Sequence, residues 1–293
     1  MGFEFTLVDV FSDRPFGGNR LAVFPDAEGI SETEMQSLAR EFNFPETTFV
    51  LPPSDPSNTC RVRIFTPLQE LPFAGHPTIG TAAVLASLGK GDAQRQFVLE
   101  EGIGPVSVAI DGRTVQLCLR SPEYETADET PPVDAITKAL GLPPDSVAES
   151  FYASVGVRFC FVRLTDRDLV DRAVLDRAAW EAGVADGWSP HLYVFAEDDG
   201  DRSRLNARMF APALGIDEDP ATGSACAALV AAIAHRSPNQ DATCHVQIDQ
   251  GLAMGRPSSL EGTARKEEGR LAEVTVGGHA TIIGNGVMTL PAI

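Results

Sequence analysis

A short segment that combines a strand, a turn and a glycine-headed helix occurs twice in this chain. The first copy reads FTPLQELPFAGHPTIGTAAVLA over 65–86, and the second reads FAPALGIDEDPATGSACAALVAAI over 210–233. Gly75-His76 in the first copy corresponds to Gly223-Ser224 in the second. Because the copies lie roughly 145 residues apart, the pattern indicates an internally duplicated chain.

The start of each expected helix has a definite chemistry. The first amides of a helix have no partner within it, and a glycine there lets a ligand, preferably an anion, approach the backbone. His76 adds a group that can move a proton near neutral pH. If the two halves face each other, both helix starts converge on one cleft, which suits a small carboxylate whose neighbouring carbon loses and regains a proton.

The order of the expected elements favours an α+β fold with two domains. With 293 residues the chain is near the upper limit for one core, and the stretch 121–132, which has acids, prolines and no apolar period, is the expected boundary. Sequential strands with few helices predict, in each half, a sheet wrapped around its alanine-rich helix. We therefore expect one domain over 1–120 together with a C-terminal strand over 281–293, and a second over 121–280.

Hydrophobic periodicity and turn residues predict the individual elements. Helices are expected over 31–42, with Ser31 and Glu34 forming a capping box, and over 78–88, 133–140 and 166–182. Strands are expected over 5–11, 20–24, 49–51, 60–65, 96–100, 105–110, 114–119, 154–164, 191–196, 244–248, 271–276 and 279–290. The charged piece 261–270 is interpreted as a solvated turn.

Charge and cysteine usage limit the possible partners. A net charge of −18 repels phosphate backbones, so we expect no nucleic acid partner. No run of 18 apolar residues occurs and the N-terminus lacks the layout of a signal peptide, so no membrane span is expected. Five cysteines without a CxxC pair are typical of a reduced cytoplasm.

Glu46 is the strongest candidate for a catalytic residue. It lies at the end of a loop among the apolar residues Phe44, Pro45, Phe49 and Val50. Such surroundings disfavour a charged carboxyl, so its pKa should rise toward the range useful for proton transfer. The alternative is an exposed loop acid or a helix-end cap.

Further candidates surround the two glycine junctions, and each has a structural alternative. His76 either handles protons or bonds a backbone carbonyl. Asp219 either aligns the substrate or His76, or complements the helix dipole. Ser224 is a substrate donor, a helix cap, or both, and Asn19 is a turn residue or a donor to the substrate carboxylate. Of the cysteines, only Cys226, which follows the second junction, has a functional alternative.

Searches for cofactor and metal motifs find nothing. The chain has no Walker loop, no GxGxxG that opens a helix after a strand, no HExxH and no GxSxG. Its histidines, His76, His191, His235, His245 and His279, show no metal-ligand spacing. We therefore expect a site without a metal and without a cofactor.

Taken together, these pieces resemble the PhzF-type phenazine-biosynthesis isomerase family. Each piece alone is modest, but the ordered set is highly specific and spans most of the chain. The matching segments are VDVF (8–11), GNRLAVF (18–24), PETTFV (45–50), RIFTP (63–67), ELPFAGHP (70–77) and DPATGSA (219–225).

The resemblance implies the fold of diaminopimelate epimerase: two pseudo-symmetric domains, each a sheet barrel around a central helix, with the site between them. In that superfamily two cysteines stand just before the junction glycines, where this chain has Ala74 and Thr222. Paired-thiol racemase chemistry is therefore disfavoured. The PhzF-like branch uses one glutamate, which falls on Glu46.

By the same resemblance, the helper positions map to His76, Asp219 and Ser224, and backbone amides near Gly75 and Gly223 bind the substrate. Family likeness also implies a homodimer. Where the family usually has Asn-Pro, this chain has Asn19-Arg20, a departure that concerns the edge of the pocket.

The sequence therefore predicts a cofactor-independent isomerase that acts on a small cyclic or amino carboxylic acid, similar to trans-2,3-dihydro-3-hydroxyanthranilate isomerase. Glu46 takes a proton from a carbon next to an unsaturated system and returns it to another carbon. Two alternatives stay open: an amino-acid epimerase or racemase on the same scaffold, and a non-catalytic protein that binds small acids.

Overall fold

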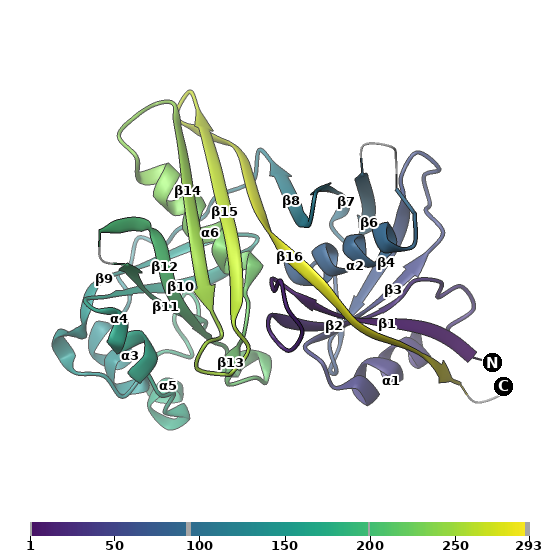
Figure 1. Cartoon of the computed structure of the whole chain (residues 1–293). Coiled ribbons are helices and arrows are strands. Elements are labelled where there is room, and N and C mark those ends of the chain that lie inside the picture. The colour runs from purple at the N-terminus through teal and green to yellow at the C-terminus, as the bar shows by residue number, and fades with distance from the viewer. Residues whose placement is uncertain (1, 92–94, 199, 291–293) are drawn as a thin grey trace. The chain divides into compact units, whose positions relative to one another are not determined.

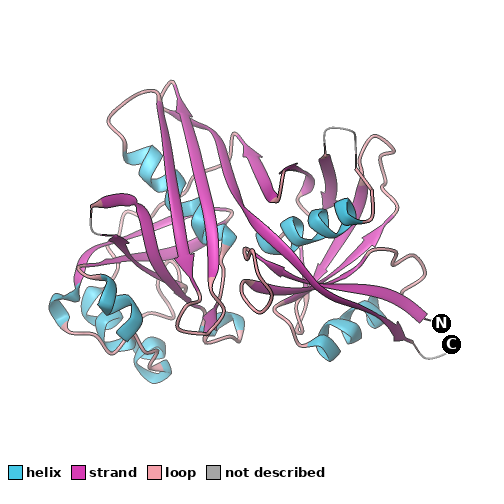
Figure 2. Cartoon of the chain, viewed as in Figure 1, coloured by secondary structure: helices cyan, strands magenta, loops and turns pink. Residues whose placement is uncertain are grey.

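The computed structural model describes residues 2–91, 95–198 and 200–290. It divides into two compact units, residues 1–119 with 277–293, and residues 120–276. Each unit is described by itself below. Their strands and helices are drawn in Figures 1 and 2.

The first unit is a closed barrel of eight strands within the described residues. The strands follow each other in the order β1, β2, β3, β4, β6, β7, β8 and β16, and β16 returns to pair with β1. Their bounds are β1 Gly2–Val10, β2 Asn19–Phe24, β3 Glu46–Leu51, β4 Cys60–Phe65, β6 Gln96–Glu101, β7 Gly104–Asp111, β8 Thr114–Arg120 and β16 Arg270–Thr289. The short strand β5 Glu70–Leu71 pairs with β4.

Two helices cover opposite faces of this barrel sheet. Helix α2 (Gly75–Ser87) is buried along most of its length and contacts β1, β2, β3 and β7, so it fills the interior. Helix α1 (Glu32–Phe42) packs its apolar face on the outer side, against a cluster that includes Phe24, Phe49 and Phe65. The expected capping box is present, because Ser31 and Glu34 bond each other's backbone amides.

The second unit wraps a sheet around one helix as well. Helix α6 (Gly223–Arg236) contacts β9, β10, β14 and β15 and is buried on most faces. The sheet order is β15, β14, β12, β11, β10, β9, with β13 paired to β12. The strands are β9 Val147–Val155, β10 Val157–Leu164, β11 Leu192–Asp198, β12 Asp201–Phe210, β13 Glu218–Asp219, β14 Ala242–Gln250 and β15 Ser258–Glu267. Three short helices, α3 Val133–Ala139, α4 Arg167–Arg172 and α5 Arg177–Gly183, and the 3-10 turns 144–146 and 212–214 complete it.

These observations confirm the α+β fold, whereas several expectations for single elements were wrong. The strands expected over 271–276 and 279–290 form the single strand β16, and the strand expected over 154–164 is divided between β9 and β10. The segment 166–182 forms two helices instead of one, because Asp166 and Asp176 each cap a new helix start with their side chain. The charged piece 261–270 belongs largely to strand β15, in which alternate residues face inward. The inward Lys266 is tolerated because its ammonium group donates to the carbonyls of His235 and Ser237 at the end of α6.

Candidate active site

Strand β3 of the first barrel positions Glu46. It was expected in a loop, but it is the first residue of β3 and pairs with Leu21 of β2. Two residues further on, Thr48 contacts the Thr81 hydroxyl of α2 at 2.8 Å. Because strand side chains alternate with period two, Glu46 faces the same helix. Its Oε2 atom lies 3.2 Å from Nε2 of His76, and its side chain is 15% exposed.

His76 is a neutral imidazole in this setting. It is the second residue of α2 and is buried, and burial lowers its pKa from 6.5 to about 3, with a hydrogen bond to the backbone of Arg20 acting in the opposite direction. The contact with Glu46 is therefore not an ion pair. The side-chain amide nitrogen of Asn19 lies 3.4 Å from Nδ1 of the same ring.

The N-terminus of α2 lacks a side-chain cap. Its N-cap residue is Ala74, no side chain caps this end, and the first turn has no acidic residue. The amides of Gly75 and His76 are thus left to an external acceptor. Close packing fixes the helix, since a Cβ at Gly80 would lie 2.6 Å from Leu21 and 2.7 Å from Val10.

The second unit builds a different polar cluster at the start of α6. The N-cap residue Thr222 donates its hydroxyl to Oδ2 of Asp219 at 2.6 Å. The side chain of Gln250 donates to the Asp219 carbonyl and to the Thr222 hydroxyl at 2.8 Å and 3.0 Å, and it accepts from the Thr222 amide and from the Tyr193 hydroxyl. Ser224 is half-buried in the first turn of the helix.

The structure thus brings Asn19, Glu46 and His76 together in the first unit, beside Gly75. Asp219, Gly223 and Ser224 belong to the second unit, around the start of α6. The roles of all seven residues stay predictions.

Sequence reasoning missed Gln250 and Tyr193. The missed signal was a polar residue at an inward-facing strand position: Val246, Ile248 and Gln250 are the buried members of alternating β14. A glutamine in that series needs internal partners, because an unpaired amide is costly to bury.

Two sequence departures can now be placed. Ala74 and Thr222, at the positions where the broader superfamily has cysteines, are the N-cap residues of α2 and α6. Arg20 is exposed and its guanidinium lies 5.0 Å from the centre of the Phe44 ring, in the loop just before Glu46.

Cys226 is buried, and burial raises the pKa of its thiol to about 12.

Two searches over the described part of the chain were negative. No group of three or more His, Cys, Asp or Glu side chains there is arranged to hold a metal ion. None of its helices combines the length and the apolar character that a membrane crossing needs.

Comparison with known proteins places the chain in a family. The family model described as "Phenazine biosynthesis-like protein" (PhzC-PhzF) matches residues 8–286. An uncharacterized isomerase of Mesorhizobium japonicum is 39% identical, with 97% of both chains covered. The trans-2,3-dihydro-3-hydroxyanthranilate isomerase of Pseudomonas aeruginosa is 35% identical, over 97% of this chain and 98% of its own. A Bacillus anthracis PhzF-family crystal structure is 21% identical and superposes with a TM-score of 0.88, covering 99% of this chain and 100% of its own, so the fold agrees throughout. On these grounds the chain is a member of the phenazine biosynthesis-like PhzC-PhzF family.

Proposed function

We propose that the protein is an isomerase that moves a proton between two carbons of a small carboxylic acid without a cofactor, with Glu46 as both acid and base. The main observation behind this proposal is the contact between Glu46 Oε2 and His76 Nε2 at 3.2 Å. Asn19 contacts the other ring nitrogen, Nδ1. Full-length relatives named as isomerases support the reaction class. The substrate is an acid similar to trans-2,3-dihydro-3-hydroxyanthranilate, after the name of the P. aeruginosa relative.

One carboxyl group is sufficient for this reaction. The Glu46 carboxylate removes a proton from a carbon next to an unsaturated system and so becomes the acid that protonates another carbon, which regenerates the carboxylate. Neutral His76 contacts the carboxylate at Oε2 and helps to orient it without placing a full positive charge beside it. Asn19 contacts Nδ1 of the same ring and so helps to hold the orientation of the imidazole.

The uncapped start of α2 supplies the electrostatic part of the proposal. The amides of Gly75 and His76 bind the substrate carboxylate or the negative charge that develops during proton transfer. By the duplicated motif, Asp219, Gly223 and Ser224 are assigned further substrate contacts. Arg20, stacked on Phe44 near Glu46, is assigned to the substrate selectivity of this family member.

The test is solvent deuterium incorporation into a dihydro-hydroxyanthranilate-like acid. Glu46→Gln should lower the rate by about 10²–10⁴, the usual scale for acid–base catalysis. Glu41→Gln, the same change on an exposed carboxyl of α1, is the matched control and should leave the rate unchanged. Equal rates for wild type and Glu46→Gln would remove Glu46 from the mechanism. Loss of optical rotation of an amino acid, without movement of a double bond, would instead identify an epimerase.

We further propose that the protein is a homodimer of the cytoplasm. No disulfide joins the five cysteines, Cys60, Cys118, Cys160, Cys226 and Cys244, all of which are described, and this supports a reducing compartment. Sedimentation at several protein concentrations tests the dimer, since a monomer mass throughout would exclude it.

A further inference from the structure

Strand β6 has a carboxyl group at one of its inward-facing, buried positions. Phe97, Leu99 and Glu101 are its buried residues, and the residues between them are more exposed. Glu101 is 8% exposed, its Oε1 atom lies 2.7 Å from the Thr78 hydroxyl, and Oε2 has no hydrogen-bond partner within the described part of the chain. Burial raises its pKa from 4.5 to about 8.

Thr78 connects this carboxyl to the start of α2. Its hydroxyl lies 2.8 Å from the carbonyl oxygen of the N-cap residue Ala74. A hydroxyl has one hydrogen to donate, so it cannot donate fully to Ala74 and to Glu101 at once. If it donates to Ala74, the short contact with Glu101 needs a hydrogen on the carboxyl. An ionised Glu101 would instead accept the hydrogen bond from the Thr78 hydroxyl. The Ala74 carbonyl would then keep only the long hydrogen bond from the Thr78 backbone amide, at 3.3 Å.

The duplicated half of the chain shows what this position requires. Strands β4 and β12 precede α2 and α6, and they pair in parallel with β6 and β14, which follow those helices. The two registers agree relative to the proline turns. In the first half Arg61, six residues before Pro67, pairs with Glu100. In the second half Asn206, six residues before Pro212, pairs with Asp249. Glu101 therefore corresponds to Gln250, whose amide donates to the N-cap Thr222 hydroxyl at 3.0 Å. Only a protonated Glu101 can donate in the same way.

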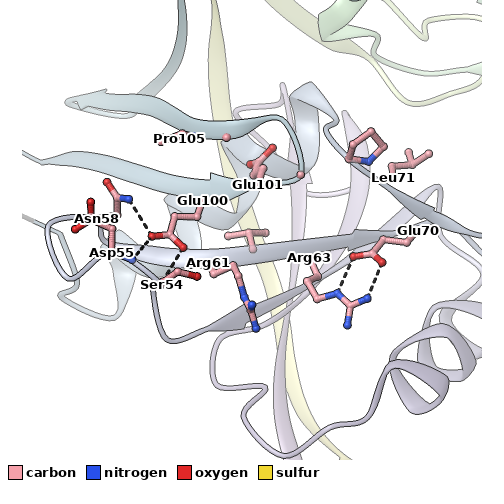
Figure 3. Close-up of a pocket in the computed structure, with 14 residues that line it drawn as sticks. Ser54, Asp55, Asn58, Arg61, Arg63, Glu70, Leu71, Glu100, Glu101 and Pro105 are labelled. Carbon is pink, nitrogen blue, oxygen red and sulfur yellow. Dashed lines mark hydrogen bonds and ion pairs between the residues drawn. The ribbon is translucent and has the colours of Figure 1, made fainter.

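The surroundings leave Glu101 apart from the neighbouring charges. Figure 3 shows Glu100 turned toward Asn58, Asp55 and Ser54, whereas Glu101 lies on another side of the pocket. The turn after Glu101 packs closely on the segment that leads into α2, since a Cβ at Gly102 would lie 2.6 Å from Pro72. The titratable and charged groups on the packed elements and in the pocket are His76, Cys60, Lys90, Asp55, Arg61, Arg63, Glu70 and Glu100.

Three of these charged groups, Arg63, Glu70 and Glu100, have hydrogen-bond or ion-pair partners of their own. Arg63 is paired with Glu70 and Glu32, and Glu100 accepts hydrogen bonds from Asn58 and two backbone amides. Burial raises the pKa of Glu101, and the hydrogen bond with Thr78 is the one interaction that lowers it.

We propose that Glu101 is a positioning residue for the start of α2, where its protonated carboxyl holds the Thr78 hydroxyl on the Ala74 carbonyl. Ionisation of Glu101 redirects that hydroxyl and loosens the turn that carries Gly75 and His76. The consequence for catalysis rests on the proposed function, which places the reaction at this turn. The structural consequence does not depend on any substrate.

Hydrogen exchange of the Thr78 amide, corrected for the intrinsic rate at each pH, is the first test. From about pH 6 to about pH 9.5 the wild type should show an increase of about fivefold, the size of one neutral hydrogen bond. Glu101→Gln, which places the residue of the other half here, should remove the increase. Thr78→Val should exchange fast at every pH, and Thr78→Ser, which keeps the hydroxyl, should behave as wild type.

A carbon-13 NMR titration of the wild-type carboxyl groups needs no variant, and it should show one glutamate that ionises near pH 8. A flat exchange profile in the wild type, an increase that survives in Glu101→Gln, or the absence of such a glutamate would each overturn the proposal. With substrate, KM should rise over the same pH range in the wild type and stay constant in Glu101→Gln. If no isomerase activity is found, the exchange and NMR results still decide the role of Glu101, so the two failures are distinguishable.

Discussion

Replacing Glu101 by glutamine should stabilise the protein, and the gain should grow with pH. The unfolded chain releases the Glu101 proton near pH 4.5, whereas the folded barrel keeps it until about pH 8. Below pH 4.5 the Glu101 carboxyl is protonated in both the folded and the unfolded chain, so its ionisation does not change the free energy of unfolding. As pH rises between the two values, the wild type loses stability relative to the variant at about 1.4 kcal/mol per pH unit. The difference is therefore about 3 kcal/mol at pH 7 and levels off above pH 8.

Urea unfolding followed by far-UV circular dichroism, from about pH 5 to about pH 8.5, measures this difference as a displaced midpoint at constant slope. Glu100→Gln is the matched control on the next residue. Hydrogen bonds from Asn58 and the amides of Asp55 and Ser54 lower the pKa of Glu100 to about 2, so its charge stabilises the fold above pH 4.5. That variant should be less stable than wild type near neutrality, the opposite sign. A Glu101→Gln difference that stays constant from pH 5 to pH 8 would refute the reasoning.

Three further outcomes are expected. Gly80→Ala should lower the free energy of unfolding by about 1–2 kcal/mol in urea titrations, since overpacking against Leu21 and Val10 outweighs the gain in helix propensity. His76→Gln should flatten the loss of stability on acidification, because the wild-type imidazole stays neutral in the fold to about pH 3 but takes up a proton in the unfolded chain below pH 6.5. Gln250→Leu should cost about 1–3 kcal/mol, since the Thr222 amide loses its acceptor, and Tyr193→Phe less.

The sequence indicated the barrel-and-helix fold because its strongest signals are local. The glycine junctions at Gly75 and Gly223, the alanine-rich helices that follow them and the capping box at Ser31 are all visible within short windows. Glu46 was singled out for its apolar neighbours, although it lies in a strand and not in a loop.

What the sequence did not reveal depends on contacts between distant segments. Nothing near Glu101 indicates that Thr78, 23 residues earlier, shares a hydrogen with it. Gln250 lies 57 residues from Tyr193 and 28 from Thr222, and it reaches Tyr193 because β11 and β14 both pair with β12. Inward-facing polar residues at the ends of β6 and β14 were the available signal, and strict counting of alternate positions would have found both.

The closure of the barrel ties its assembly to the order of protein synthesis. Strand β1 is translated first, but its partner on one side is β16, with Gly2 opposite Thr289 and Val10 opposite Ala280. On the ribosome the first unit therefore has an open seam until the last strand has left the exit tunnel, whereas the intervening 120–276 unit has all of its own strands before then. A released chain that is truncated after residue 276 should protect the second unit from protease and leave β1 and β2 accessible.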